Sequence, residues 1–269
     1  MVNQEQIKKL QKLIANSHNI VAFTGAGCST ESGLPDFRGS GGLYSKKIGT
    51  NLPISTESGI PDFRSVDGLY QQKYRYPPEE IISHHFYKKN PEEFFAFYRS
   101  RMLYLDAKPN TAHKKLAELE QAGKLLAVVT QNIDGLHQMA GSRKVLELHG
   151  SVHRNYCTRC GKEYDARFIL ESEGVPRCSC GGIVKPDVVL YEESLDGATV
   201  QKAVEALEQA DLLIVGGTSL AVYPAAGLLQ YYQGGPIVVI NKSATPLDHR
   251  ADLLIQEGIG GVLGEIAAR

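Results

Sequence analysis

Short apolar runs alternate along this chain with stretches of helical periodicity. Strands buried on both faces are predicted at residues 20–23, 125–129, 212–215 and 237–240, with a shorter extended run at 188–191. Apolar positions three or four apart predict helices at residues 4–17, 77–89, 91–105, 111–122, 197–209 and 224–232. Strand, polar turn and helix in repetition predict an α/β fold built on a doubly wound parallel sheet.

Polar or glycine-rich segments follow four of the predicted strands, at residues 24–30, 131–134, 217–219 and 241. Open α/β sheets bind ligands at the carboxyl ends of their strands, so we expect these segments to meet at one edge. The first contains Gly25-Ala26-Gly27, which is typical of a phosphate-binding turn. The next glycine is Gly33, outside the usual G-x-G-x-x-G spacing, so a purely structural turn is nearly as well supported.

Residues 130–150 carry most of the candidate chemistry. Asn132, Asp134 and His149 offer an amide, a carboxylate and an imidazole, which together could bind a polar small molecule and move one proton. The competing interpretation is a turn at Asp134-Gly135 and a surface histidine without a chemical role. The neighbouring motifs favour the functional interpretation.

Four of the five cysteines lie close together, in the pattern Cys157-x2-Cys160-x17-Cys178-x-Cys180. Two close pairs on separate turns are typical of a zinc ribbon, so we predict one tetrahedral zinc ion. With four protein ligands the ion has no open position, which makes it structural. Cys28 stands apart, and we interpret it as a small packing residue because no base is adjacent in sequence.

One segment is repeated. Residues 29–44 read STESGLPDFRGSGGLY and residues 55–70 read STESGIPDFRSVDGLY, so 12 of 16 positions are identical at an offset of 26 residues. The repeat is too short and too rich in glycine and proline to be a solenoid unit.

Length and charge limit the class of protein. A chain of 269 residues can form one large α/β domain and a smaller module. With 29 Lys and Arg against 30 Asp and Glu, the net charge of −1 does not favour a nucleic-acid or membrane surface. No apolar run approaches a membrane span and the N-terminus lacks a signal pattern, so we expect a cytoplasmic protein. We also expect it to be a monomer.

Several motifs in this order are similar to those of one family. They are Gly25-Ala26-Gly27-x-Ser29 running into Gly33-Leu34-Pro35-Asp36-Phe37-Arg38, Thr130-Gln131-Asn132-Ile133-Asp134-Gly135-Leu136-His137, Glu147-Leu148-His149-Gly150, the cysteine quartet, Gly217-Thr218-Ser219-Leu220 and Asn241. The chain resembles the sirtuins, NAD-dependent protein lysine deacylases, and its undivided bacterial members most.

The resemblance implies a Rossmann-like NAD-binding domain of residues 1–38, 106–150 and 186–269. It also implies a small domain of residues 39–105 and 151–185, made from a helical insertion and the zinc ribbon. NAD and an acylated lysine of a protein or peptide would lie between them. The acyl oxygen would attack the nicotinamide ribose to give an alkylimidate, and the acetyl group would pass to ADP-ribose with release of nicotinamide.

The resemblance also implies residue roles. His149 would be the general base, while Asn132 and Asp134 would order the ribose and the nicotinamide. The peptide would lie as a strand between residues 188–190 and 221–223, with modest side-chain selectivity. The NAD-binding residues would be Gly25, Ala26, Gly27, Thr30, Phe37, Arg38, Gln131, Asn132, Ile133, Asp134, His149, Gly217, Thr218, Ser219, Asn241 and Ile259.

Two features depart from the family pattern. The family has one Pro-Asp-Phe-Arg loop, whereas this chain has two, and we expect the first copy, with Phe37 and Arg38, to occupy the NAD site because it is joined to Gly25–Gly27. Tyr98 and Arg101 match the Tyr-x-x-Arg pair of desuccinylating sirtuins, so a desuccinylase or demalonylase is an alternative. A core tyrosine beside a solvated arginine is the better supported interpretation of that pair.

Two other classes of protein remain open. One is a catalytically impaired protein that binds NAD or ADP-ribose, because the repeated loop could block the site. The other is a zinc-ribbon binding module joined to a dehydrogenase-like domain, which ranks last because no hydride-transfer residues stand out.

Overall fold

The computed structural model describes residues 3–36 and 76–267 of the chain. Its large domain is built on a parallel six-stranded sheet in the order β3-β2-β1-β7-β8-β9. The strands are β1 (Ile20–Thr24), β2 (Leu125–Thr130), β3 (Val145–Glu147), β7 (Leu212–Gly216), β8 (Ile237–Ile240) and β9 (Leu253–Ile255). The strand order changes direction beside β1, which is where open α/β sheets bind ligands.

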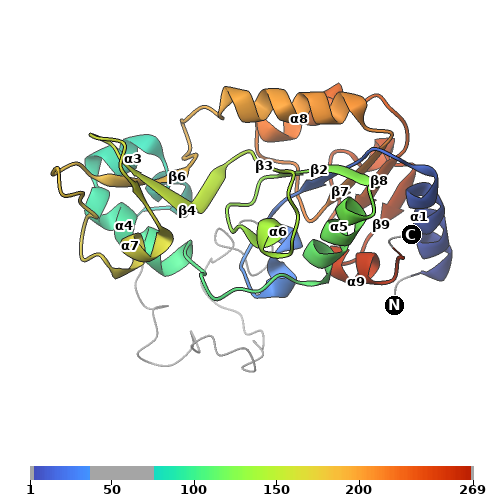
Figure 1. Ribbon diagram of the computed structural model, residues 1–269, viewed down its shortest axis with the longest axis horizontal. Coiled ribbons are helices and arrows are strands. Elements are labelled where there is room, and N and C mark those ends of the chain that lie inside the picture. The colour runs from blue at the N-terminus through green and yellow to red at the C-terminus, as the bar shows by residue number, and fades with distance from the viewer. Residues whose placement is uncertain (1–2, 37–75, 268–269) are drawn as a thin grey trace.

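Alternate side chains of these strands enter two separate cores. Ile20 and Ala22 of β1 join the core beneath α1 (Gln4–Asn16), α5 (Thr111–Gln121) and α9 (Ile259–Gly264). Val21 and Phe23 join the core beneath α8 (Gly197–Gln209) and η5 (Ala225–Tyr231). Helices therefore cover both faces of the sheet, as Figure 1 shows, and the predicted doubly wound α/β fold is confirmed.

The small domain lies at the opposite end of the molecule from the two termini (Figure 1). Its three-stranded sheet has the order β5-β4-β6, with β4 (Gly150–Cys157) between β5 (Glu163–Tyr164) and β6 (Val184–Val188). Aromatic side chains of the helical segment pack with apolar residues of this sheet in a third core. The helices of this domain are α2 (Pro78–Ile81), α3 (His84–Lys89), α4 (Pro91–Arg101) and α7 (Ala166–Glu171).

Some element boundaries differ from the prediction. Residues 77–89 form two helices instead of one, because the Ser83 side chain caps α3 by accepting a hydrogen bond from the Phe86 N–H. Residues 224–232 form the 3₁₀ helix η5 instead of an α-helix, and α4 ends at Arg101 instead of residue 105. The extended run at 188–191 is mostly not strand, because β6 ends at Val188. The strands β3, β4, β5 and β9 were not predicted. Strands β3, β5 and β9 are too short to show periodicity, and the eight residues of β4 do not alternate regularly between apolar and polar.

Candidate active site and zinc centre

The carboxyl ends of β1, β2, β7 and β8 open into one cavity of about 440 Å³. The side opposite these strand ends is formed by residues 188–193 and by Ile82, Met102 and Tyr104 of the helical segment. Every predicted NAD-binding residue that lies within the described ranges lines this cavity: Gly25, Ala26, Gly27, Thr30, Gln131, Asn132, Ile133, Asp134, His149, Gly217, Thr218, Ser219, Asn241 and Ile259. Phe37 and Arg38 lie outside the described residues.

The glycine-rich turn after β1 packs against the end of β7. The Gly27 N–H donates to the Gly217 carbonyl at 2.8 Å. A Cβ atom at Gly27 would lie 2.9 Å from that carbonyl oxygen, so a side chain cannot fit there. The glycines therefore let two strand ends approach each other, and without side chains they let a phosphate come close to the backbone at the cavity wall.

A hydrogen-bond network joins Ser29, Asn132 and Asp134 at the bottom of the cavity. The Ser29 hydroxyl donates to Asp134 Oδ2 at 2.6 Å and accepts from Asn132 Nδ2 at 3.0 Å. Asp134 Oδ1 also accepts from the Leu136 N–H at 2.9 Å. Ser29 thus holds both Asn132 and Asp134, the residues predicted to order the ribose. The sequence motif contains Ser29 but did not indicate this role.

His149 lies on the segment between β3 and β4. Its Nδ1–H donates to the Gln131 carbonyl at 2.9 Å, so the Nε2 lone pair is free for a ligand. Burial lowers the pKa of His149 below its ordinary value, although the bond to Gln131 opposes this. The Val189 N–H donates to the His149 carbonyl at 3.0 Å, which joins the histidine to the cavity wall formed by residues 188–193. A neutral imidazole held in this way can accept a proton.

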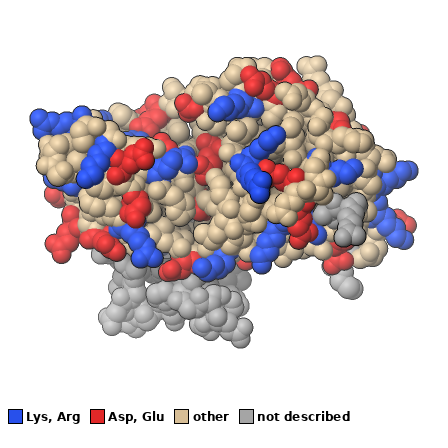
Figure 2. All heavy atoms as spheres, viewed as in Figure 1, with Lys and Arg blue, Asp and Glu red and all other residues tan. Residues whose placement is uncertain are grey.

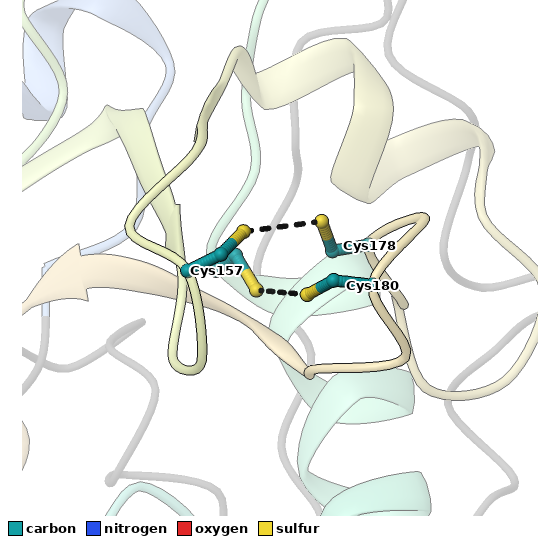
Figure 3. A group of neighbouring side chains, drawn as sticks. Cys157, Cys178 and Cys180 are labelled. Carbon is teal, nitrogen blue, oxygen red and sulfur yellow. Dashed lines mark hydrogen bonds between the residues drawn. The ribbon is translucent and has the colours of Figure 1, made fainter.

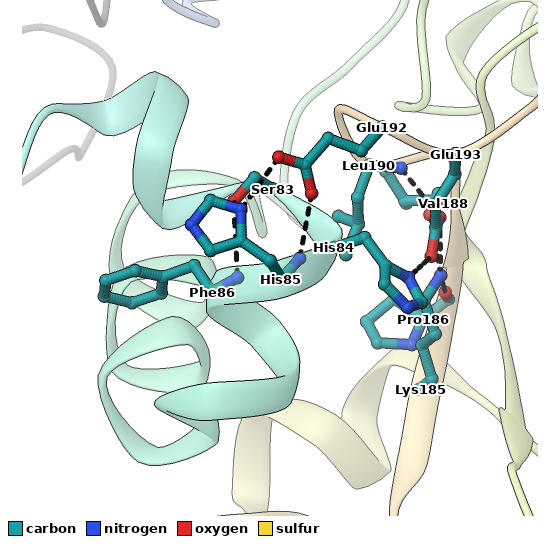
Figure 4. A network of polar contacts seen from close by, with 10 residues as sticks. All are labelled: Ser83, His84, His85, Phe86, Lys185, Pro186, Val188, Leu190, Glu192 and Glu193. Carbon is teal, nitrogen blue, oxygen red and sulfur yellow. Dashed lines mark hydrogen bonds and ion pairs between the residues drawn. The ribbon is translucent and has the colours of Figure 1, made fainter.

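That wall is supported by the helical segment (Figure 4). His84 Nδ1 lies 2.7 Å from Glu193 Oε1, and Lys185 Nζ lies 3.0 Å from Glu193 Oε2. Burial raises the pKa of Glu193, but its bonds to His84, the Leu190 N–H and Lys185 outweigh burial and the pKa is lowered overall. The charged carboxylate therefore fixes the backbone that borders the cavity.

Two buried histidines next to this network were not identified from the sequence. His113 of α5 lies with Nε2 3.4 Å from Ser29 Oγ, and His137 of α6 (Leu136–Met139) lies with Nε2 3.0 Å from Thr24 Oγ1. Burial lowers the pKa of His113 to about 4 and that of His137 to about 3, so both rings are neutral at physiological pH. His137 belongs to the motif of residues 130–137, which could have identified it. His113 lies in the first turn of α5, after the N-cap residue Asn110, and has no such signal.

The four cysteines of the quartet meet between β4 and the loop before β6 (Figure 3). Their sulfur atoms all lie within 4.8 Å of one another, with Cys157 and Cys180 at 3.4 Å and Cys160 and Cys178 at 3.6 Å. Sulfurs around tetrahedral zinc stand about 3.8 Å apart, because each Zn–S bond is about 2.3 Å. The quartet fits one structural zinc ion. None of the four cysteines lines the cavity.

Tyr98 and Arg101 do not act together in this structure. Tyr98 is completely buried and stacks on Phe94 with ring centroids 5.8 Å apart, whereas Arg101 lines the cavity. Tyr98 is therefore the core residue that the sequence analysis favoured. Arg101 is half-buried and borders the cavity, whereas Tyr98 is not part of the cavity lining among the described residues.

The surface is consistent with the nearly zero net charge. On the face shown in Figure 2, basic and acidic side chains are interspersed and do not form a large patch of one sign. Among the described helices, none has the length and apolar character needed to cross a membrane.

Fold and site together define an α/β nucleotide-binding protein with an attached zinc ribbon. A model of the Sir2 family matches residues 52–224. The chain is 53% identical to an NAD-dependent protein deacetylase of Clostridium perfringens, over 97% of this chain and 98% of that protein. It is 52% identical to the corresponding protein of Clostridium acetobutylicum, over 98% of both chains.

Solved structures of Sir2 proteins are similar to this chain as well. A Sir2 variant with a deacetylated p53 peptide and 3′-O-acetyl ADP-ribose is 36% identical, covers 97% of this chain and 99% of its own, and has a TM-score of 0.81. A Sir2 complex with a p53 peptide and NAD is 37% identical, covers 96% and 95%, and has a TM-score of 0.76. The chain belongs to the Sir2 family.

Proposed function

We propose that this protein is an NAD-dependent protein lysine deacetylase that transfers the acetyl group of acetyl-lysine to ADP-ribose and releases nicotinamide. One observation carries the proposal. The imidazole of His149, the amide of Asn132 and the carboxylate of Asp134 border a single cavity with the glycine-rich turn after β1. The Sir2 relatives named as NAD-dependent deacetylases support it.

Each residue has a role that follows from its contacts. His149 accepts a proton from a ribose hydroxyl at Nε2, because its Nδ1–H is held by the Gln131 carbonyl. Asn132 and Asp134 orient the ribose and the nicotinamide amide, since Ser29 fixes both side chains. NAD supplies the electrophilic ribose carbon and the nicotinamide leaving group. The glycine-rich turn of residues 25–27 faces the phosphates, and Thr218, Ser219, Asn241 and Ile259 border the adenosine half.

The acetylated lysine would enter between residues 188–190 and 221–223, of which Val188, Val189, Leu190, Val222 and Tyr223 line the cavity. We assign the large domain to residues 1–38, 106–150 and 186–269 and the small domain to residues 39–105 and 151–185. The peptide would pair through its backbone with these flanking segments, so the sequence around the lysine should matter little. We further propose that the protein is cytoplasmic, since the four clustered cysteines suit zinc in a reducing compartment. We also propose that it is a monomer.

The test is mass spectrometry of an acetyl-lysine peptide incubated with the zinc-loaded protein, with and without NAD. We expect deacetylated peptide, nicotinamide and acetyl-ADP-ribose only when NAD is present. A protein that binds NAD but releases no nicotinamide would instead be the impaired binding protein. A matched succinyl-lysine peptide should react poorly, because Tyr98 is not at the cavity.

A further inference from the structure

Three side chains that could bind a metal meet beneath the nucleotide cavity, away from the cysteine quartet. They are Cys28 in the 3₁₀ turn η1 (Ala26–Cys28), His113 in α5 and His137 in α6. The Cys28 sulfur and one ring nitrogen of each histidine lie within 4.8 Å of one another. All three side chains are buried, with exposed fractions of 0% for Cys28 and His113 and 1% for His137. We refer to these residues as the buried triad.

The hydrogen bonds around the buried triad leave a lone pair on His137 and allow one on His113. The Thr24 hydroxyl donates to Thr130 Oγ1 and therefore accepts from the His137 Nε2–H at 3.0 Å. His137 Nδ1 then carries a lone pair, and this buried atom has no hydrogen-bond partner among the described residues. His113 Nδ1 lies 3.0 Å from Asn110 Oδ1 and 3.3 Å from the Asn110 backbone nitrogen, so it can donate to the first or accept from the second. In the tautomer with the proton on Nδ1, the lone pair is on Nε2, which lies 3.9 Å from the Cys28 sulfur. A second ring nitrogen held by an oxygen acceptor is the usual arrangement of a metal-binding histidine.

Distances and charge also suit a cation. Tetrahedral zinc with one sulfur and two nitrogen ligands separates those atoms by about 3.5 Å, so the triad needs to contract by about 1 Å. Burial raises the pKa of the Cys28 thiol, and the negative charges of Asp134 and Glu31 raise it further. The same negative potential at the sulfur favours a cation there. The Ser29 hydroxyl, 3.4 Å from His113 Nε2, stands next to the same position.

We propose that Cys28, His113 and His137 form a second metal site, which takes one soft divalent ion of the Zn²⁺ class and thereby inhibits the enzyme. On binding, a sulfur–metal bond forms and the S–H bond breaks. The proton goes to solvent, and no electron is transferred. The ion draws His113 and the adjacent Ser29 inward, which breaks the support of Asp134 and Asn132. Ser29 borders the cavity, so the ion enters from there and bound NAD protects against it.

Metal binding can be measured without activity, and only its inhibitory effect rests on the proposed function. The protein with zinc in the cysteine quartet is titrated with Co²⁺, and bound metal is counted after gel filtration. We expect a second ion with a thiolate-to-cobalt absorption band. In protein loaded with ¹¹³Cd, we expect two NMR resonances, one for four-sulfur ligation and one for ligation by one sulfur and nitrogens. One ion and one resonance would overturn the proposal without any variant.

Variants then assign the ligands. Cys28→Val keeps the packing volume without a ligand atom, and we expect at least a tenfold loss of affinity for the second ion, with the quartet zinc retained as evidence of folding. His137→Gln should have the same effect. His153→Asn is the matched control, because His153 contacts the Asp134 carbonyl but lies outside the buried triad, and this variant should keep the second ion. An unchanged second ion in Cys28→Val would overturn the assignment.

The inhibitory effect is tested by zinc added to an assay of turnover. We expect inhibition that is relieved by preincubation with NAD and weakened at least tenfold in Cys28→Val. If the second ion binds and turnover is unaffected, the regulatory part of the proposal is wrong and the metal site stands. If the wild-type protein shows no turnover in any condition, the proposed function fails and the titration still decides the metal site.

Discussion

At the scale of single residues, the chemistry depends on how the protein holds His149. A histidine in water is half protonated near pH 6.5, and a proton acceptor is useful only when it is neutral. Burial lowers the pKa of His149, and the Gln131 carbonyl selects the tautomer with a free Nε2. Position and protonation state therefore come from the surroundings of the ring.

Replacement of this ring should remove proton transfer without removing the cavity. For His149→Ala we expect kcat to fall about 10²- to 10⁴-fold, the usual contribution of general acid–base catalysis, with NAD binding less affected. Steady-state kinetics and NAD titration by calorimetry measure the two effects. His153→Ala changes a histidine outside the base position, and its kcat should fall much less. Equal losses in both variants would argue against His149 as the base.

The pH dependence follows from the lowered pKa of His149. The neutral ring is the active form, and a lowered pKa keeps it neutral to more acidic pH. The rate constant kcat/KM for NAD should therefore rise with pH, with a midpoint below about 6.5, and be flat at higher pH until another group titrates. A pH profile at saturating peptide measures this midpoint. A midpoint above 6.5 would contradict the assignment of the base to a buried histidine.

At the scale of elements, the zinc quartet holds together short strands that would not form a stable sheet without it. β5 has two residues, and the quartet joins the end of β4 to the loop before β6. β6 continues into residues 188–193, which border the cavity. Loss of the ion should therefore reach the active site through β6, even though no quartet cysteine lines the cavity.

The variant Cys178→Ser should lose zinc, unfold at least about 5 °C lower and lose most turnover, because three ligands hold the ion weakly and β6 loses its anchor. Metal analysis, thermal unfolding and activity measure these changes. Ser179→Ala, at the exposed position between Cys178 and Cys180, is the matched control and should behave as the wild type. A zinc-free variant with full turnover would show that the ribbon is dispensable.

At the scale of the whole molecule, the repeated segment raises the question of which copy serves the cavity. Leu34, Pro35 and Asp36 of the first copy line the cavity. The family model matches residues 52–224, a range that contains the second copy and leaves out the first. These observations favour different copies, and the arginines Arg38 and Arg64 allow a direct test.

We expect Arg38→Ala to lower turnover about a hundredfold or more, and Arg64→Ala to change turnover less than about threefold. The reason is that the first copy follows directly from the glycine-rich turn at the cavity, so on chain length we expect Arg38 to reach the ribose. Steady-state kinetics with an acetylated peptide distinguish the two variants, each of which is the control for the other. The opposite ranking would assign the loop to the second copy.

The sequence predicted much of the sheet and the cavity because these features are local. Buried parallel strands are continuous apolar runs, and polar residues at their ends must share an edge once the strands are parallel. The cysteine spacing likewise limits the geometry to one ion. The roles of Ser29 and His113 could not be predicted, since they depend on contacts between residues 84 and 105 positions apart.

By itself, the sequence determined the parallel strands, the polar edge and the zinc quartet, because periodicity and spacing act over a few residues. Only the tertiary structure decided that Tyr98 is core while Arg101 borders the cavity, since burial depends on what packs against a helix. The same is true of Cys28. It has no base near it in sequence, yet α5 and α6 bring two histidine rings close to its sulfur. His137 of α6 contacts Thr24 at the end of β1, and α5 packs against α6.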